Sequence, residues 1–425
     1  MRKILFLLLF TSASIAGAQD TPQLVRAARM LDVRTGKILA NPTVLITGDL
    51  ITAVNPQTPP ANARVIDLGD VTLLPGFIDA HTHLASEIGP NMRLEPVTET
   101  EVDAAYKAVK NGRITLLAGF TTVRDFGGDV TVALGRAVER GEVMAPRVVP
   151  SRYALGITGG HCDQTGYAPG VLEHSVEHGV ADGPWQVVQA VRYQIKHGAQ
   201  VIKTCATAGV LSMEGPVGAQ QYTYEELKAM VDEAARHGVK VAAHAHGTDG
   251  IKAAVRAGVA SIEHGSILDD EAIALMKQRG TWLVPTTYLA DRINLDVLPA
   301  HIQQKARAVL PQARASLRKA IAAGVKIAFG TDAAVYPHGE NAREFAVLTS
   351  LGMPTIEALR AATIYAADLL GKSDRGEISA GKLADMIAVP GNPLEDIRAT
   401  ERVVFVMLGG KVVKSPTPLI EVTSP

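Results

Sequence analysis

Two histidines end a short apolar segment, and their spacing is the first sign of chemistry in the chain. Residues 73–83 read LLPGFIDAHTH. Side chains alternate between the two faces of a strand, so His81 and His83 are expected on one face at its carboxyl end. Two imidazoles placed in this way can bind one metal ion. Taken alone, the pair fits two solvated histidines at a strand end equally well.

Possible metal ligands recur where later apolar segments end. These segments end in TGGH (158–161), VIKT (201–204), AHAHG (243–247), IEHG (262–265) and FGTD (329–332). The chain has 12 histidines among 425 residues, so this recurrence predicts a shared site rather than unrelated structural histidines. Imidazole and carboxylate ligands suit Zn²⁺ or a similar divalent ion.

Lys203 and Asp332 extend the predicted site beyond histidine. Lys203 is expected to point into the interior, where an unpaired ammonium group is costly unless its pKa falls or it finds a partner. An ion pair with an inner acid is the alternative. Asp332 is expected to bind metal, to accept a proton from metal-activated water and to pass that proton to the departing nitrogen. Its alternative role is a helix N-cap, which Thr331 could also fill.

Other residues are candidates for contact with a substrate. His246 shares a strand face with His244, so spacing alone allows either to be the metal ligand. His161 follows two glycines, which let the backbone approach a ligand closely, and a histidine on a surface loop is the alternative. Tyr222 lies on a loop after a strand, where it either hydrogen-bonds a substrate carboxylate or anchors the next helix. Ser86 is expected in the pocket wall.

The middle of the chain alternates predicted strands with amphipathic helices, which is typical of a parallel (β/α)₈ barrel with its active site at the carboxyl ends of the strands. An open doubly wound sheet is the alternative, although no phosphate-type GxGxxG follows a strand. The predicted strands are Leu73–Ala80, Thr121–Asp125, Arg147–Pro150, Val201–Lys203, Val239–Ala243, Ala260–Glu263, Trp282–Pro285 and Ile327–Gly330. The predicted helices include Glu101–Ala118, Val187–His197, Tyr224–His237 and Pro311–Ala323.

Both ends of the chain are rich in short alternating segments separated by Asp, Gly, Asn and Pro, which predicts one small β-sandwich. The predicted fold class is therefore α/β, a (β/α)₈ TIM barrel with a small β-sandwich domain formed by both chain ends. The predicted organisation is a signal peptide at 1–18, the first part of the sandwich at 19–72, the barrel at 73–372 and the second part of the sandwich at 373–425.

The first residues resemble an export signal. Arg2 and Lys3 precede the apolar run Ile4–Phe10, and the small residues Ala16–Ala18 form a cleavage pattern. We therefore expect a mature chain in the periplasm or the medium; a cytoplasmic protein with an apolar start is the alternative. The apolar run is too short to span a bilayer, and no membrane partner is expected.

The charge and cysteine content of the chain restrict its binding partners and its covalent cross-links. The formal net charge is −1 and no basic block occurs, so nucleic-acid binding has no support. The two cysteines, Cys162 and Cys205, do not form a disulfide scaffold of the small secreted kind. They either pair in an oxidising compartment or remain buried thiols.

The combined motifs, from LPGFIDAHTH (74–83) to GKLAD (381–385), resemble the amidohydrolase superfamily over essentially the whole mature chain. This resemblance implies a distorted TIM barrel flanked by a β-sandwich, with one or two metal ions. It also implies that Lys203 reacts with CO₂ to form a carbamate that bridges two zinc ions. The ligands that it implies are His81, His83, Lys203, His244, His264 and Asp332.

Within the superfamily, TGGH and HAHG resemble the imidazolonepropionase-related group. That group includes Xaa-Pro dipeptidases and amidases that release a C-terminal amino acid from an N-acyl group, among them ochratoxin-degrading enzymes. Similar subfamilies place a histidine at the position of His161 on the substrate carbonyl, where it stabilises the developing oxyanion. The chain departs from the pattern at Ser151–Tyr153, where smaller residues are expected. Arg152 would pair with a substrate carboxylate or with an acid outside the barrel.

These observations predict a metal-dependent amidohydrolase that cleaves the amide bond before a C-terminal residue of a small molecule or dipeptide. The predicted catalytic residues are Asp332, His161 and His246, and the resemblance implies a homo-oligomer. A cyclic amidase that opens a lactam or imidazolone ring shares the metal chemistry but needs no pocket for a free carboxylate. A periplasmic binding barrel without catalysis is the non-enzyme alternative.

Overall fold

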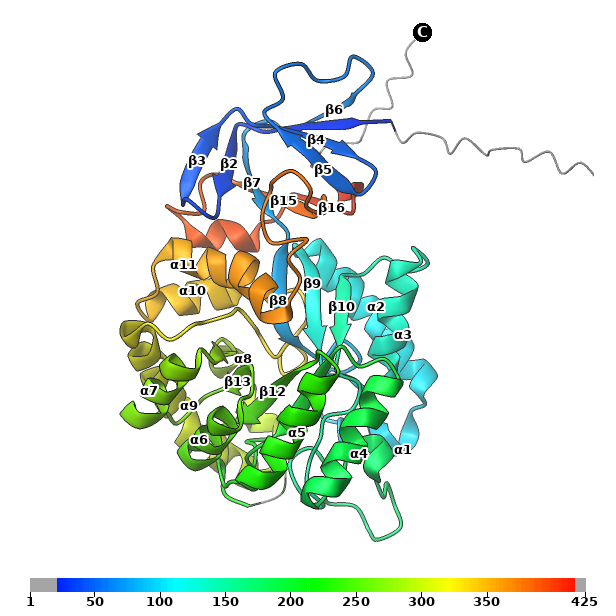
Figure 1. The fold of residues 1–425 in the computed structure, drawn as a ribbon, viewed down its shortest axis with the longest axis vertical. Coiled ribbons are helices and arrows are strands. Elements are labelled where there is room, and N and C mark those ends of the chain that lie inside the picture. Colours follow the sequence, from blue (N-terminus) through cyan, green and yellow to red (C-terminus); the bar gives the residue numbers. More distant parts are fainter. Residues whose placement is uncertain (1–20, 212, 214, 417–425) are drawn as a thin grey trace, which may run out of the picture.

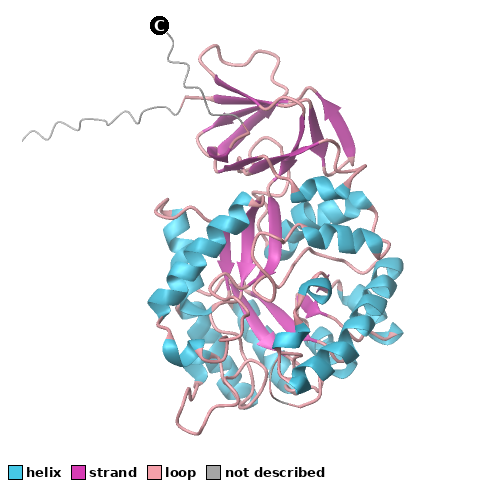
Figure 2. Cartoon of the chain, turned by 180° about the vertical axis from the view of Figure 1, so that it is seen from behind, coloured by secondary structure: helices cyan, strands magenta, loops and turns pink. Residues whose placement is uncertain are grey.

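The computed structural model describes residues 21–416 except 212 and 214, so the predicted signal peptide lies outside the described residues. A helix-rich body lies below a smaller β-rich domain (Figure 1). Seen from behind, the strands of the body run through its interior and the helices lie outside (Figure 2). Within the described ranges, no helix is long and apolar enough to cross a membrane.

Both ends of the described chain build the small domain from two sheets. Its strands are β1 Gln23–Arg26, β2 Arg29–Asp32, β3 Lys37–Ala40, β4 Thr43–Thr47, β5 Leu50–Val54, β6 Arg64–Asp67, β7 Val71–Pro75, β15 Met386–Pro390, β16 Phe405–Leu408 and β17 Lys411–Lys414. One sheet has the order β5–β4–β1–β6 and the other β17–β16–β15–β7–β2–β3. Ile46 from the first sheet and Leu73 and Phe405 from the second are fully buried in one apolar cluster, which joins the two sheets.

The predicted first barrel strand, Leu73–Ala80, is two strands in the structure. β7 pairs with β15 and β2 in the small domain, whereas β8, Phe77–Thr82, pairs with β9, Phe120–Asp125, in the body. Gly76 separates them, and a Cβ added there would lie 2.1 Å from Oγ1 of Thr121. The chain therefore crosses between domains at a position that admits only glycine, and the predicted boundary at 72 and 73 falls inside β7.

Parallel strands line the interior of the body. Besides β8 and β9 they are β10 Arg147–Pro150, β11 Val201–Cys205, β12 Lys240–Ala245, β13 Ser261–His264 and β14 Trp282–Val284. They form two parallel sheets, with the orders β10–β9–β8 and β11–β12–β13–β14. Single bridges link the sheets, and one of them pairs Leu155, beyond β10, with Thr204 of β11.

The prediction of an eighth strand at Ile327–Gly330 is wrong, because these residues do not form a regular strand. Its pairing with β14 is reduced to one bridge between Ile327 and Leu283. The segment still lies between β14 and β8, because the amide of Ala328 donates to the carbonyl of Leu283 and the amide of Ala80 donates to that of Phe329. Strand order and direction thus follow the predicted barrel, while continuous pairing is confined to the two sheets.

Helices cover the outside of these sheets (Figure 1). They are α1 Glu95–Thr98, α2 Glu101–Leu117, α3 Gly128–Glu139, α4 Gly183–Lys196, α5 Tyr224–Arg236, α6 Thr248–Ala257, α7 Asp270–Arg279, α8 Leu289–Arg292, α9 Ala300–Ala323, α10 Arg343–Ser350, α11 Thr355–Arg360 and α12 Ala366–Leu370. The helix predicted to begin at Pro311 begins at Ala300, and Pro311 lies exposed inside it. At an exposed position, water can satisfy the carbonyl that loses its amide partner.

Candidate active site

The carboxyl ends of the interior strands meet at one cavity of about 340 Å³. All six predicted metal ligands line it, although they come from separate elements of the chain. They are His81 in β8, His83 just after it, Lys203 in β11, His244 in β12, His264 in β13 and Asp332 after the segment 327–330. The structure therefore brings the whole predicted ligand set together.

One group of ligands gathers around the carboxylate of Asp332. The Nε2 atoms of His81 and His83 lie 3.3 Å and 3.2 Å from the same oxygen, Oδ1. Burial alone would raise the pKa of Asp332, but the two imidazoles beside it bring that pKa well below its ordinary value. The carboxylate is therefore ionised, which suits both metal binding and proton transfer.

A second group consists of His244, His246 and His264. Ring nitrogens of these three residues lie within 4.8 Å of one another. Burial lowers the pKa of each ring, to about 3 for His246, so the imidazoles are neutral, as metal ligation requires. Nε2 of His244 is buried and has no hydrogen-bond partner among the described residues. Such an atom is costly unless a ligand satisfies it, so the donor set fits a divalent metal ion.

Glu263 fixes the orientation of His81. Its Oε2 lies 2.8 Å from Nδ1 of His81, which leaves Nε2 for the cavity. The other oxygen, Oε1, accepts a 2.7 Å bond from Arg124. Burial would raise the pKa of Glu263, but Arg124 and His81 lower it to about 2. A buried ion pair thus holds one imidazole in place.

Neighbouring hydroxyl groups hold two further imidazoles. Nδ1 of His264 lies 2.8 Å from Oγ1 of Thr286, and Nδ1 of His246 lies 2.7 Å from Oγ of Ser266. These contacts leave the Nε2 atoms to face the other ligands. They were not predicted, because the partners are separated by about a strand and a helix in the sequence.

Four non-glycine residues in the cavity wall have left-handed backbone conformations. Their φ angles are 71° at His264, 50° at Thr286, 59° at Asp332 and 131° at Ala334. Alternation along β13 would place Glu263 and His264 on opposite faces, and the positive φ at His264 ends that alternation. Backbone conformations of this kind cost free energy and gather at functional sites.

Lys203 lines the cavity, with 4% of its surface exposed. Burial lowers its pKa to about 8, against the opposing charges of Glu263 and Asp332. Its Nζ lies 4.1 Å from the ring centroid of Phe126. Among the residues that the structure describes, Lys203 has no ion pair, so the alternative interpretation of a salt-bridged lysine is not supported.

Part of the cavity wall is apolar. Helix α9 presents Ala306, Val309, Leu310 and Ala313, whose spacing places them on one face of a helix. Val210 and Leu211, Leu289, Ile293 and Val335 complete the wall. The cavity can therefore surround an apolar group next to the ligands.

Three of the predicted substrate contacts lie in the cavity wall. They are His161, His246 and Ser86. The ring of His161 lies 4.2 Å from that of His244, between centroids, so it is beside the second ligand group. Its position agrees with a role at the substrate carbonyl.

Two other predicted substrate contacts are wrong. Tyr222 is fully buried in the apolar core outside the cavity, where its hydroxyl donates to the carbonyl of Ala181 at 3.0 Å. Arg152 is also buried; it forms an ion pair with Asp129 and donates to the Gln194 side chain. Tyr222 therefore anchors a loop, and Arg152 pairs with an acid outside the barrel, which was its alternative role.

The sequence left the state of the two cysteines open, and the structure contains a Cys162–Cys205 disulfide with Cα atoms 5.8 Å apart. Both cysteines line the cavity. The pairing joins residues 43 positions apart, so no local pattern could predict it.

Comparison with known proteins identifies the family of the chain. Residues 72–413 match the amidohydrolase family. Ochratoxinase of Aspergillus niger is 35% identical over 370 residues, which cover 81% of this chain and 76% of the relative. Imidazolonepropionase of Deinococcus radiodurans is 27% identical over 423 residues, or 95% and 96% of the two chains.

Solved structures share the fold. A Xaa-Pro dipeptidase with bound methionine in the active site has a TM-score of 0.88 at 38% identity, covering 93% of this chain and 100% of that chain. The crystal structure of A. niger ochratoxinase has a TM-score of 0.82 at 31% identity, covering 94% and 97%. These neighbours imply a TIM-barrel-type fold with an additional domain. The chain belongs to the amidohydrolase family and is a hydrolase that acts on C–N bonds.

Proposed function

We propose that the chain is a metal-dependent amidase that hydrolyses the amide bond before a C-terminal amino acid, in N-acyl amino acids or Xaa-Pro dipeptides. The observation that carries this proposal is a cavity lined both by two groups of possible metal ligands and by a set of apolar side chains from α9 and neighbouring loops. The similarity to ochratoxinase and to a Xaa-Pro dipeptidase supports the same class of substrate.

Two zinc ions are proposed as the cofactors. Their ligands would be His81, His83, His244, His264, Asp332 and carboxylated Lys203. The unpartnered Nε2 of His244 and the desolvated amine of Lys203 support this assignment. When bound, the ions would lower the pKa of a water molecule and polarise the substrate carbonyl.

The chain's own residues would move the proton and hold the substrate. Ionised Asp332 accepts a proton from the attacking water and delivers it to the departing nitrogen. His161 donates a hydrogen bond to the carbonyl oxygen, whose charge grows as the bond breaks. His246 is already held by Ser266 and contacts the substrate beside the ligands.

The acyl side of the substrate is assigned to the apolar wall. A small dipeptide would leave much of the wall formed by α9 unfilled, whereas an aromatic acyl group would bury it. We therefore rank N-acyl amino acids with bulky apolar acyl groups above Xaa-Pro dipeptides.

One observation favours a second candidate. With Tyr222 and Arg152 outside the cavity, no arginine or tyrosine lines it within the described ranges. A cyclic amide would need no such residue for a free carboxylate. Hydrolysis of an imidazolone or lactam, as by an imidazolonepropionase-like enzyme, is therefore the alternative.

A substrate panel separates these proposals. The zinc-loaded enzyme is assayed with N-acyl-L-phenylalanines of increasing acyl size, their C-terminal amides, Xaa-Pro dipeptides and an imidazolone. We expect hydrolysis of the free acids, increasing with acyl size, and much slower hydrolysis of the blocked amides. Hydrolysis of the imidazolone alone would support the alternative, and no hydrolysis of any free acid would contradict the proposed amidase.

Export to the periplasm or medium is also proposed, since disulfides persist in oxidising compartments and Cys162 is bonded to Cys205. Cell fractionation and N-terminal sequencing test it, and a mature chain that starts at Gln19 is expected. The homo-oligomer stays a prediction, which light scattering of the purified protein tests.

A further inference from the structure

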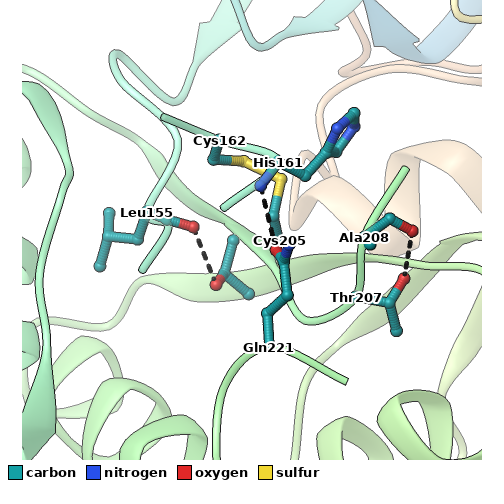
Figure 3. Close-up of a disulfide and its surroundings, with 8 residues drawn as sticks. Leu155, His161, Cys162, Cys205, Thr207, Ala208 and Gln221 are labelled. Carbon is teal, nitrogen blue, oxygen red and sulfur yellow. Dashed lines mark hydrogen bonds between the residues drawn. A yellow bond between two sulfur atoms is a disulfide. The ribbon is translucent and has the colours of Figure 1, made fainter. Parts of the chain in front are cut away.

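The Cys162–Cys205 disulfide lies in the cavity wall, close in the chain to two residues of the proposed mechanism. Figure 3 shows the disulfide with His161 beside it. Cys162 directly follows His161, and Cys205 ends β11, two residues after Lys203. The bond therefore ties the loop that carries His161 to the strand that carries Lys203.

The loop of residues 157–175, which contains His161, has no regular helix or strand and is largely exposed. At its inner end, the amide of His161 donates to Oε1 of Gln221 at 3.1 Å, beside the disulfide (Figure 3). The amide of Gln221 in turn donates to the carbonyl of Ala206, the residue after Cys205. One covalent bond and one hydrogen bond thus fix the backbone at His161 to the end of β11.

Neighbouring residues pack closely against the ring of His161. A Cβ added to Gly209 would lie 2.1 Å from Cε1 of the His161 ring, and the ring of His244 lies 4.2 Å away, between centroids. At the neighbouring position, a Cβ added to Gly156 would lie 2.7 Å from Cβ of Cys162. This close packing restricts the imidazole on the side of Gly209, and its other surroundings include the cavity, so a shifted loop would displace the ring within the wall.

We propose that the disulfide is a positioning device for His161, so that the enzyme is fully active only when Cys162 and Cys205 are bonded. This inference rests on the proposed function, in which His161 contacts the substrate carbonyl. Reduction by a dithiol transfers two electrons and two protons to the protein: the sulfur–sulfur bond breaks, two thiols form, and the dithiol becomes a cyclic disulfide. The loop then loses its covalent link to β11 at this point, while the weaker hydrogen bond from His161 to Gln221 remains.

The first test is a double-mutant cycle between the disulfide and His161. Cys162→Ser/Cys205→Ser should lower kcat by about 10- to 100-fold, because a misplaced contact of about 1 Å costs up to about 10² in rate. In a His161→Ala background the same two substitutions should change kcat little, since the residue that they position is gone. Additive losses in the two backgrounds would overturn the proposal.

The second test does not depend on turnover. Hydrogen exchange, followed by mass spectrometry, compares wild type with Cys162→Ser/Cys205→Ser in the presence of zinc. We expect faster exchange in residues 157–175, unchanged exchange in β8 and β12, and unchanged zinc content. Equal exchange in the loop would overturn the proposal.

Reduced wild type provides the same comparison if the variants fold poorly. Dithiothreitol should lower kcat and loosen the loop, and reoxidation should restore both; retention of full kcat by the reduced protein would overturn the proposal. If the oxidised wild type hydrolyses nothing in the substrate panel, the proposed function fails, whereas the exchange comparison still decides whether the disulfide holds the loop.

Discussion

At the scale of single residues, His81 shows how the fold prepares a metal ligand. Its Nδ1 contacts Glu263, which also pairs with buried Arg124, so two side chains from two other strands fix this imidazole. Glu263 stands next to predicted ligand His264, but a glutamate beside a histidine has no specific spacing signal. Its role depends on the approach of β8, β9 and β13, which the sequence does not show directly.

Replacing Glu263 with glutamine should weaken metal binding by about 10- to 100-fold, as loss of a partner to a ligating histidine typically does. It should also lower the free energy of unfolding by about 3–5 kcal/mol, because the charge of Arg124 stays buried without its partner. Zinc titration and thermal unfolding measure the two effects. Glu271→Gln is the control, since Glu271 lies in an exposed ion pair; equal zinc affinity in both variants would contradict this role.

Replacing Asp332 with asparagine should lower kcat by about 10²- to 10⁴-fold, because an amide cannot accept the proton from water. Zinc content is measured in the same preparation, so that a lost proton acceptor is distinguished from a lost ligand. Asp270→Asn, at an exposed side chain, should leave kcat unchanged. A variant that keeps its zinc and most of its kcat would contradict the proposed proton transfer.

The lowered pKa of Lys203 leads to a prediction about how zinc restores activity to the metal-stripped enzyme. Burial lowers this pKa to about 8, and the uncharged amine is the form that reacts with CO₂. Reactivation of the metal-stripped enzyme by zinc should therefore accelerate with added bicarbonate and, when the bicarbonate is adjusted to keep dissolved CO₂ constant, more strongly as the pH rises from below to above about 8. Reactivation that is independent of bicarbonate at every pH would contradict carboxylation of Lys203.

At the scale of elements, α9 forms the apolar wall with residues at helical spacing. Ala313→Leu would project a larger side chain into the cavity, so KM for a bulky N-acyl phenylalanine should rise while that for a small dipeptide changes little. Ala315→Leu, on the exposed side of the same helix, is the matched control. Equal KM values for the bulky substrate in both variants would place the acyl group elsewhere.

Several elements were predictable because their residues carry a local signal. The apolar strands β9 to β14 and helices α2 and α5 lie within a few residues of their predicted positions. The break at Gly76 was not predictable, because it depends on the distant side chain of Thr121. The helix predicted at Pro311–Ala323 was too short, because proline usually starts or ends a helix, whereas α9 continues through the exposed Pro311.

At the scale of the whole molecule, the metal site was more predictable than the substrate site. The ligand motifs repeat at strand ends, and parallel strands bring their carboxyl ends together. The place of each ligand residue in the fold therefore follows from its place at the end of a predicted strand. Tyr222 and Arg152 also follow strands in the sequence, as the ligand motifs do. Their side chains instead bind within the fold: Tyr222 donates a hydrogen bond to Ala181, and Arg152 forms an ion pair with Asp129. Those contacts depend on loop paths, for which the sequence offers no periodicity.

The proposed metal centre would connect the two parallel sheets, since one group of possible ligands comes from β8 and the segment after 330, and the other from β12 and β13. Its direct test is elemental analysis of the purified enzyme, combined with hydrolysis of N-acyl phenylalanine before and after removal of divalent ions by a chelator. We expect two zinc ions per chain, loss of hydrolysis on chelation and recovery when zinc is returned. Undiminished hydrolysis by protein free of divalent ions would contradict the account.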